Sequence, residues 1–247
     1  YLLDAAARTF TIDPVGLDEV TGAWAGLRPL LHEEGKSPSE ISRKDEIMVS
    51  PSGLISMAGG KLTTFRRMAE RTTEMVLARL SEAGAGPFKA KGSSEALLLD
   101  GGETGEDVHA FAEALKLRWP ATAELVDRLV GLYGSNAERI VESIVGDPVL
   151  GERMAPNSLL TRAEVEYAVR FEFALTVEDV LERRTRAFLF EPDNGLPPAP
   201  KVARVMARLL DWDENRIQQE VSHYAAHVQH VKSFASPSAR SDQAAHA

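Results

Sequence analysis

The chain has 247 residues, no cysteine and a net charge of −9, with an isoelectric point near 5.3. The missing cysteines exclude disulfides, thiol catalysis and cysteine-ligated zinc. The acidic balance argues against general nucleic-acid binding, which needs a basic surface. No apolar run approaches the roughly 20 residues of a membrane span, and we expect no signal peptide at the N-terminus.

The first forty residues alternate between apolar and polar segments. Residues 1–10 carry apolar side chains at helical spacing, which predicts a helix. Residues 20–27 are apolar enough for a buried strand. Residues 31–40 are polar and include Gly35 and Pro38, which predicts a loop.

A hairpin signature follows at residues 47–58. Two apolar runs flank the sequence Ser-Pro-Ser-Gly at positions 50–53, where proline suits the second turn position and glycine the last. Gly59 and Gly60 end the second strand, and Thr63 or Thr64 can cap a helix that continues to about Leu80. The order is therefore strand, glycine turn, helix.

The rest of the chain is predicted to be helical. Residues 83–105 are rich in Gly, Ser and Ala and are interpreted as a linker between two domains. Capping boxes begin at Ser135 and Thr161, Gly134 marks a helix end, and another helix starts at Thr176 and ends near residue 190. A proline-rich loop over 192–200 precedes two more helices, and the tail over 233–247 is predicted to be disordered.

The sequence GGKLTT at positions 59–64 is the most informative local motif. It lacks the glycine and the hydroxyl residue that the spacing of a P-loop requires, so we reject nucleoside triphosphate hydrolysis. Two glycines let a ligand approach the backbone closely, and the start of a helix attracts anions. Lys61 adds a full positive charge. The motif suits a phosphate or the pyrimidine edge of a reduced flavin; a plain strand-to-helix turn is the alternative.

Three cations come from three separate segments: Arg28 in AGLRPL, Arg43 in ISR, and Lys61. A buried arginine needs a partner, which can be a structural carboxylate or a ligand anion. A lone loop arginine such as Arg43 is usually solvated. The sequence permits all three to converge on one anion.

Other charged patterns favour structural roles. The run Arg-Arg-Thr-Arg at 183–186 ends a helix, where cations interact favourably with the helix dipole. The basic stripe at 201, 204 and 208 is opposite an apolar face and favours packing in a bundle over membrane contact. His223, His227 and His230 share a helix face but lack a zinc-protease motif, so no metal site is predicted. No G-x-G-x-x-G sequence is present, and the dinucleotide fingerprint is therefore missing.

Several segments together resemble one family. YLLDAAARTF, GAWAGLRPLL, SPSEISRKDEI, SGLISMAGGKLTTFRRMAE and EVEYAVRFEFALTVEDVLERRTRAF occur in the order found in FAD-dependent, aerobic, quinone-linked glycerol-3-phosphate dehydrogenases and the similar oxidases. The resemblance is dense over residues 1–80 and good over roughly 97–190. The chain is similar to the C-terminal portion of such an enzyme.

The resemblance implies a mixed α and β fold. Residues 1–82 would hold the end of a cap domain and the closing strands and helix of an FAD-binding α/β domain. Residues 83–105 would be the linker, 106–232 an all-α helical C-terminal domain, and 233–247 the tail. The unit that holds the adenine nucleotide is not among these segments, so we expect the isolated chain not to retain FAD.

The resemblance also implies a reaction and its site. The family oxidises sn-glycerol 3-phosphate to dihydroxyacetone phosphate by hydride transfer to FAD, and the dehydrogenases pass the electrons to a quinone. Arg28, Arg43 and Lys61 would bind substrate. Residues Gly59, Gly60, Lys61, Leu62 and Thr63 would contact the flavin. No catalytic base is assigned.

The location and partners follow from the same resemblance. A cytoplasmic protein at the inner face of the cell membrane is expected, with peripheral membrane association and a homodimer as further expectations. Two alternatives stay open. One is the oxygen-dependent glycerol-phosphate oxidase, and the other is a helical association module without catalytic activity.

Overall fold

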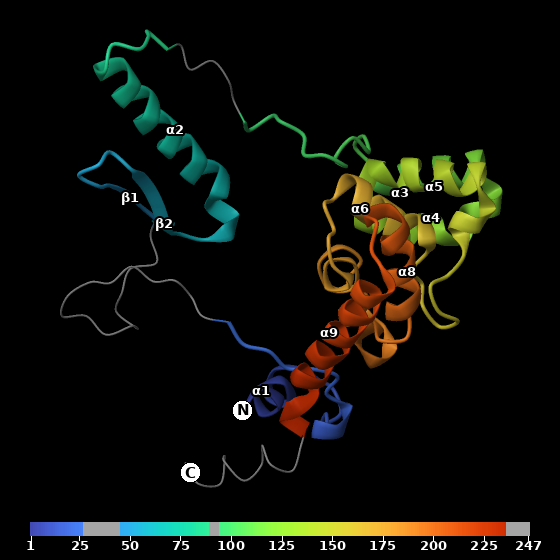
Figure 1. Cartoon of the computed structure of the whole chain (residues 1–247). Helices are drawn as coiled ribbons and strands as arrows, with labels where there is room; N and C mark the ends of the chain where they lie inside the picture. The colour runs from blue at the N-terminus through green and yellow to red at the C-terminus, as the bar shows by residue number, and fades with distance from the viewer. Residues whose placement is uncertain (27–44, 89–93, 236–247) are drawn as a thin grey trace. The chain divides into compact units, whose positions relative to one another are not determined.

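The computed structural model describes residues 1–26, 45–88 and 94–235 (Figure 1). The chain divides into two compact units: a smaller unit over Ala25–Leu98, and a larger unit that combines Tyr1–Trp24 with the chain from Leu99 onward. The described residues are mostly helical and contain one two-stranded sheet. The helical character of the C-terminal part is confirmed. The domain boundaries predicted at residues 82, 105 and 232 remain predictions.

The smaller unit contains a β-hairpin and one long helix. Strand β1 (Asp45–Val49) pairs antiparallel with β2 (Ile55–Gly59), so that Asp45 lies opposite Gly59. The Gly53 N–H donates to the Ser50 carbonyl at 2.9 Å and closes the turn. A 3₁₀ turn, η2 (Leu62–Thr64), then leads into α2 (Phe65–Glu82). The predicted hairpin and the helix after it are confirmed.

Side chains of the smaller unit are poorly covered. Among the described residues of this unit, no side chain is buried. The side chains of α2 are either exposed or only partly buried. Leu54 is 65% exposed, Leu62 88% and Phe65 57%. An ion pair between Arg71 and Asp45 links α2 to β1. A hairpin and one helix with this much exposed apolar surface are marginally stable on their own.

The N-terminal segment belongs to the larger unit. Helix α1 (Leu2–Thr9) is confirmed, and the turn η1 (Leu17–Glu19) follows it. The strand predicted over residues 20–27 is wrong for the described residues 20–26, which have no regular structure. The backbone of this segment bonds to the end of helix α9 (Glu214–Lys232) instead of to a strand: the Ala23 N–H donates to the Val231 carbonyl at 3.2 Å.

The remainder of the larger unit is a helical bundle. In Figure 1, helix α6 lies between the group α3–α5 and the pair α8–α9. Within its described residues, the one β-bridge joins Arg153 to Thr161. The helices are α3 (Val108–Arg118), α4 (Ala123–Tyr133), α5 (Ala137–Gly146), α6 (Arg162–Phe171), α7 (Ala187–Phe190), α8 (Ala199–Leu210) and α9 (Glu214–Lys232).

Short turns connect these helices. They are 3₁₀ turns at η3 (Pro120–Thr122), η4 (Gly134–Asn136), η5 (Pro148–Gly151), η7 (Pro192–Gly195) and η8 (Ser233–Ala235), and a π-helical turn at η6 (Asp179–Arg184). The tail was predicted to begin at residue 233. Its first three residues form η8, and residues 236–247 lie outside the described residues. Among the helices that are described, none is long and apolar enough to cross a membrane.

Two hydrophobic clusters form the core of the larger unit, and α6 contributes to both. Ala163 and Tyr167 belong to the cluster built from α3, α4 and α5. Val165 and Ala168 belong to the cluster built with α8 and α9. Because residues on opposite sides of α6 face different clusters, the position of this one helix fixes how the two halves of the bundle meet.

Helix ends were predicted with mixed success. Gly134 ends α4 with a φ of 57°, and an added Cβ would lie 1.9 Å from the Gly101 carbonyl oxygen, so glycine is required there. The capping box from Thr161 to Glu164 is confirmed. The box predicted at 135–138 is wrong, because Ser135 donates to Glu103 at 3.0 Å and no side chain caps α5.

The helix predicted from Thr176 to about residue 190 is interrupted. The Thr185 N–H donates to the Val180 carbonyl at 3.0 Å, which is the i to i−5 bond of a π-helix. Arg186 then adopts a left-handed conformation with a φ of 58°. The predicted proline-rich loop is partly the turn η7, where the Asn194 amide donates to the Phe188 carbonyl at 3.0 Å.

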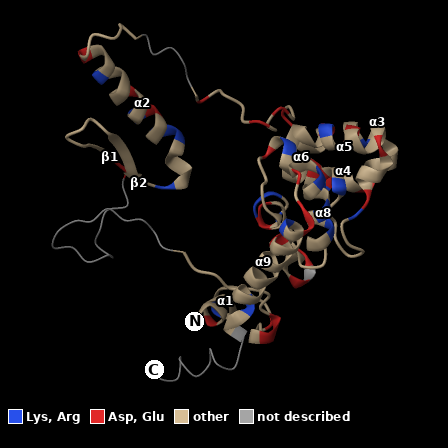
Figure 2. Cartoon of the chain, in the orientation of Figure 1, with Lys and Arg blue, Asp and Glu red and all other residues tan. Residues whose placement is uncertain are grey.

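Acidic and basic residues are interspersed over the larger unit (Figure 2), and one of their contacts involves a fully buried carboxylate. Glu164 of α6 has an exposed fraction of 0%. Its carboxylate accepts from both terminal nitrogens of Arg128 at 2.7 and 2.5 Å and from the Tyr133 hydroxyl at 3.2 Å. The Thr161 N–H and hydroxyl add two bonds of 2.9 Å each. Five donors therefore satisfy one buried carboxylate, as a buried charge requires.

The surroundings of Glu164 shift the pKa values of two partners. Burial lowers the pKa of Arg128, but the hydrogen bonds and charge of Glu164 outweigh that effect and raise it overall. Burial raises the pKa of Tyr133 well above its ordinary value, and the charge of Glu164 adds to the rise. Both shifts keep Arg128 charged and Tyr133 protonated as donors over the whole physiological range.

We predict that Glu164→Gln lowers the free energy of unfolding by about 2–3 kcal/mol. This is less than the roughly 3–5 kcal/mol for one partner of a fully buried pair, because the Arg128 side chain is 23% exposed. Urea denaturation followed by far-UV circular dichroism measures the loss. The matched control is Glu138→Gln, which removes an exposed ion pair with Arg118 and should cost about 0–1 kcal/mol. Equal losses in both variants would contradict the prediction.

Candidate functional site

The predicted glycine turn begins at Gly59, the last residue of β2. Gly59 and Gly60 have φ values of 75° and 76°, a conformation that other residues rarely adopt. An added Cβ at Gly60 would lie 2.7 Å from the Met68 sulfur and 3.1 Å from the Asp45 Cβ. Gly60 is therefore required by both backbone conformation and packing against α2 and β1. The glycines have a structural reason to be present, whatever they bind.

Lys61 joins this turn to the following helix. The Thr64 hydroxyl donates to the Lys61 carbonyl at 2.8 Å and accepts from the Lys61 N–H at 3.4 Å. These bonds hold the backbone of Lys61 extended while its side chain stays exposed. Thr64 is the N-cap residue of α2, but its hydroxyl serves the turn and does not cap the helix.

The start of η2 presents groups that attract anions. Leu62 and Thr63 begin the turn, so their N–H groups precede the first intrahelical hydrogen bond. Both residues are exposed. With the positive end of the 18-residue helix α2 behind them, these N–H groups and the ammonium of Lys61 form a corner that can bind a negatively charged group.

The structure brings together one part of the predicted site. One continuous segment, from the end of β2 into the turn η2, contains Gly59, Gly60, Lys61, Leu62 and Thr63. The two predicted substrate arginines, Arg28 and Arg43, lie outside the described residues. The convergence of three cations on one anion therefore stays a prediction.

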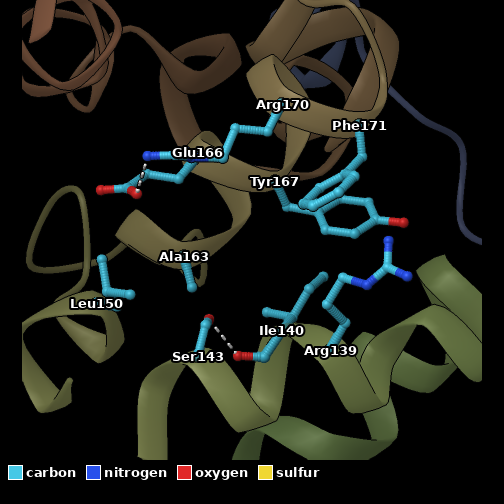
Figure 3. Close-up of a pocket in the computed structure, with 9 residues that line it drawn as sticks. All are labelled: Arg139, Ile140, Ser143, Leu150, Ala163, Glu166, Tyr167, Arg170 and Phe171. Carbon is cyan, nitrogen blue, oxygen red and sulfur yellow. Dashed lines mark hydrogen bonds and ion pairs between the residues drawn. The ribbon is translucent and has the colours of Figure 1, made fainter. Parts of the chain in front are cut away.

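A small pocket lies between α5 and α6 in the larger unit (Figure 3), with a volume of about 110 Å³. The Arg139 guanidinium lies 4.6 Å above the Phe171 ring, which packs 5.1 Å from the Tyr167 ring. Glu166 pairs with Arg170 at 3.7 Å. These charged and aromatic side chains satisfy one another, so the pocket is better explained as a packed junction between two helices than as a ligand site.

A larger pocket of about 350 Å³ lies where the chain enters the bundle, between residues 99–102 and the helices α4 and α6. Glu172 lines it, and one of its carboxylate oxygens is buried without a hydrogen-bond partner. Burial raises the pKa of Glu172, while the nearby Arg184 lowers it by a smaller amount. The Arg184 side chain donates to the Glu172 carbonyl at 2.9 Å.

The basic patterns have the structural roles that the sequence favoured. Arg183 pairs with Asp179 at 2.8 Å and also contacts Glu178. In the stripe on α8, Lys201 pairs with Glu152 at 2.7 Å, and Val202 and Met206 on the opposite face are buried. The amphipathic face of α8 is thus used within the bundle.

Among the described residues, one group of side chains that could hold a metal ion combines two segments that the sequence analysis did not connect. Glu178, Glu182 and His227 place their ligand atoms within 4.8 Å of one another, across η6 and α9. The sequence contains a signal for them, because Glu178 and Glu182 are spaced four residues apart, as are His223 and His227. What the sequence does not contain is the contact between the two segments.

The fold and the turn together define a chain with a predominantly helical bundle and a separate glycine turn whose free N–H groups and lysine can bind an anionic group. Residues 93–217 match the family described as the C-terminal domain of alpha-glycerophosphate oxidase. The chain belongs to this family.

Curated relatives extend the match to most of the chain. It is 38% identical over 224 residues to the aerobic glycerol-3-phosphate dehydrogenase of Bacillus subtilis, covering 87% of this chain and 39% of that protein. It is 32% identical over 238 residues to the protein of the same name from Staphylococcus aureus, covering 93% of this chain and 42% of that protein. The chain thus spans about two fifths of the length of these relatives.

We predict that Gly60→Ala destabilises the hairpin by about 1–2 kcal/mol, because alanine is strained at positive φ and its Cβ contacts Met68 and Asp45. Amide hydrogen exchange across β1 and β2, followed by mass spectrometry, should accelerate about 5–30-fold. Gly53→Ala is the control, since Gly53 also has a positive φ, of 87°, but no atom lies within 4 Å of an added Cβ. If both variants exchange equally fast, the packing contacts contribute nothing.

Proposed function

We propose that the chain forms the C-terminal part of a flavoprotein that oxidises sn-glycerol 3-phosphate to dihydroxyacetone phosphate. The observation that carries this proposal is the match across 87% of the chain to a relative named aerobic glycerol-3-phosphate dehydrogenase. The turn after β2 fits such a role, because it combines exposed helix-start N–H groups with an exposed lysine. In this proposal the activity belongs to a longer protein, because the relatives are more than twice as long as this chain.

In this proposal the smaller unit supplies the closing strands and helix of an FAD-binding domain. FAD would provide the acceptor for the hydride that leaves C2 of the substrate. Gly59, Gly60, Leu62 and Thr63 would contact the ring end of the flavin, and their N–H groups and the helix dipole would stabilise negative charge that develops there. The apolar surface that the smaller unit exposes would then be covered by the rest of the flavin domain.

Lys61, Arg28 and Arg43 would bind the substrate in this proposal. An arginine suits a phosphate because its planar guanidinium donates two hydrogen bonds at once. Lys61 extends from the turn between the flavin contacts and would lie beside both flavin and substrate. These contacts orient C2 for hydride transfer, so their effect extends beyond binding.

Two versions of the proposal, a dehydrogenase and an oxidase, differ in the electron acceptor. The relatives are named dehydrogenases, whereas the matching family description names an oxidase. We favour the dehydrogenase, with a quinone as acceptor. Peripheral attachment of a cytoplasmic protein to the inner face of the membrane, where quinone is dissolved, belongs to the same proposal, as does a homodimer.

A chimera tests the proposed function. The part of the Bacillus subtilis relative that precedes its match is joined to this chain, and the purified protein is assayed with glycerol 3-phosphate. We expect reduction of a soluble quinone analogue, and the same reaction with oxygen alone, followed as hydrogen peroxide, should be much slower. The relative's preceding part by itself is the control. A folded, FAD-loaded chimera without activity would favour the association module, and rapid peroxide formation would favour the oxidase.

We predict that Arg43→Ala in this chimera lowers kcat/KM for glycerol 3-phosphate about ten- to a hundredfold, because a charge-assisted hydrogen bond contributes roughly 1.5–3 kcal/mol. Glycerol lacks the phosphate, so its poorer turnover should hardly change. Lys201→Ala, which removes an ion pair with Glu152 in the helical bundle, is the control and should leave both rates unchanged. Equal losses with both substrates would mean that Arg43 supports the fold.

A further inference from the structure

We propose that Glu178, Glu182, His223 and His227 form a binding site for a divalent transition-metal ion such as Zn²⁺, which connects the π-helical turn η6 to α9. All four residues belong to the larger unit, whereas the glycine turn belongs to the smaller one. The proposal does not depend on the flavin reaction.

The local backbone places the ligands in two facing pairs. Glu178 and Glu182 are four residues apart at the start and within η6, and His223 and His227 are four residues apart on α9. Residues at this spacing on a helix share a face. A π-helical turn is uncommon and often occurs at functional sites, because it widens the helix and redirects the side chains around it.

The distances across the two elements suit a shared ion. The His227 Nε2 atom lies 2.9 Å from a Glu182 carboxylate oxygen, and the His223 Nε2 atom lies 3.5 Å from Oε2 of Glu178. Ligand atoms of Glu178, Glu182 and His227 all lie within 4.8 Å of one another. An ion placed among them would need only small side-chain rotations to reach the metal–ligand distances of roughly 2.0–2.2 Å that zinc requires.

The ligand types select the class of ion. Two imidazoles and two carboxylates supply nitrogen and oxygen donors, which suit zinc and neighbouring first-row metals better than calcium or magnesium. A divalent cation would neutralise two carboxylates whose mutual repulsion is otherwise only partly offset.

The surroundings hold the central ligand in place. The His227 ring lies 5.4 Å from the buried Phe188 ring and is only partly exposed. The neighbouring Tyr224 is fully buried, and its hydroxyl donates to the Asn194 carbonyl at 2.5 Å, which anchors α9 beside η7. Such support restricts the orientation of a metal-binding imidazole and strengthens the site. His223, with 74% of its side chain exposed, completes the site from the solvent side.

Ion pairing without a metal is the competing explanation. Arg183 contacts Oε1 of Glu178, and His227 contacts Glu182. Arg183 leaves Oε2 of Glu178 available, and its own side chain is 48% exposed, so it does not close the site. The two explanations differ in one testable respect, because only a metal site would bind added Zn²⁺ through these side chains.

Isothermal titration of the tag-free 247-residue chain with ZnCl₂ tests the proposal. We expect one ion to bind per chain, and bound Zn²⁺ to raise the melting temperature by mass action. His227→Ala and Glu182→Gln should each weaken zinc binding at least about a hundredfold, since even indirect partners of a metal site contribute about 10–100-fold. His223→Ala should have a smaller effect, because His223 is the most exposed of the four.

Two matched variants keep this test specific. His230→Ala removes an exposed histidine of the same helix that has no carboxylate partner among the described residues, and Glu214→Gln removes an exposed carboxylate of α9. Both should bind zinc as the unchanged chain does, and circular dichroism should confirm that all variants are folded. If the chain binds no zinc, or if the control variants lose as much affinity as His227→Ala and Glu182→Gln, the proposal is overturned.

Discussion

The carboxylate of Glu164 fixes the helix on which the larger unit depends. Two hydrophobic clusters meet at α6, and apolar contacts are not directional. Five hydrogen bonds to one buried carboxylate are directional, and they come from α4 and from the start of α6 itself. The register of α6 thereby sets where α8 packs and, through α8, where α9 meets η6.

The smaller unit depends on a different constraint. It has no buried side chain among its described residues, and its apolar side chains at Leu54, Leu62 and Phe65 are exposed. The residues that carry the proposed chemistry are therefore in the part of the chain with the least core. At Gly60, the side chains of Met68 and Asp45 leave no room for a Cβ, so local packing requires glycine in the turn even though the unit around it has little core.

Local signals in the sequence predicted local structure. The Ser-Pro-Ser-Gly turn, the glycine that ends α4 and the box from Thr161 to Glu164 each act through bonds between near neighbours, and each is confirmed. The strand predicted over residues 20–27 failed because Ala23 bonds to the distant end of α9. The π-helical turn was missed because apolar spacing does not distinguish it from an α-helix. In the site, the continuous run from Gly59 to Thr63 could be predicted, whereas the contact of Glu182 with His227 arises only from tertiary packing.

The division into two units has a spectroscopic consequence. All three tryptophans, Trp24, Trp119 and Trp212, lie in the larger unit, as do all four tyrosines. Intrinsic fluorescence therefore reports the state of the helical bundle and carries no emission from the segment with the glycine turn. A tryptophan introduced into α2 would give that segment its own signal, and two unfolding curves recorded on one protein would then show whether the turn and the bundle melt together.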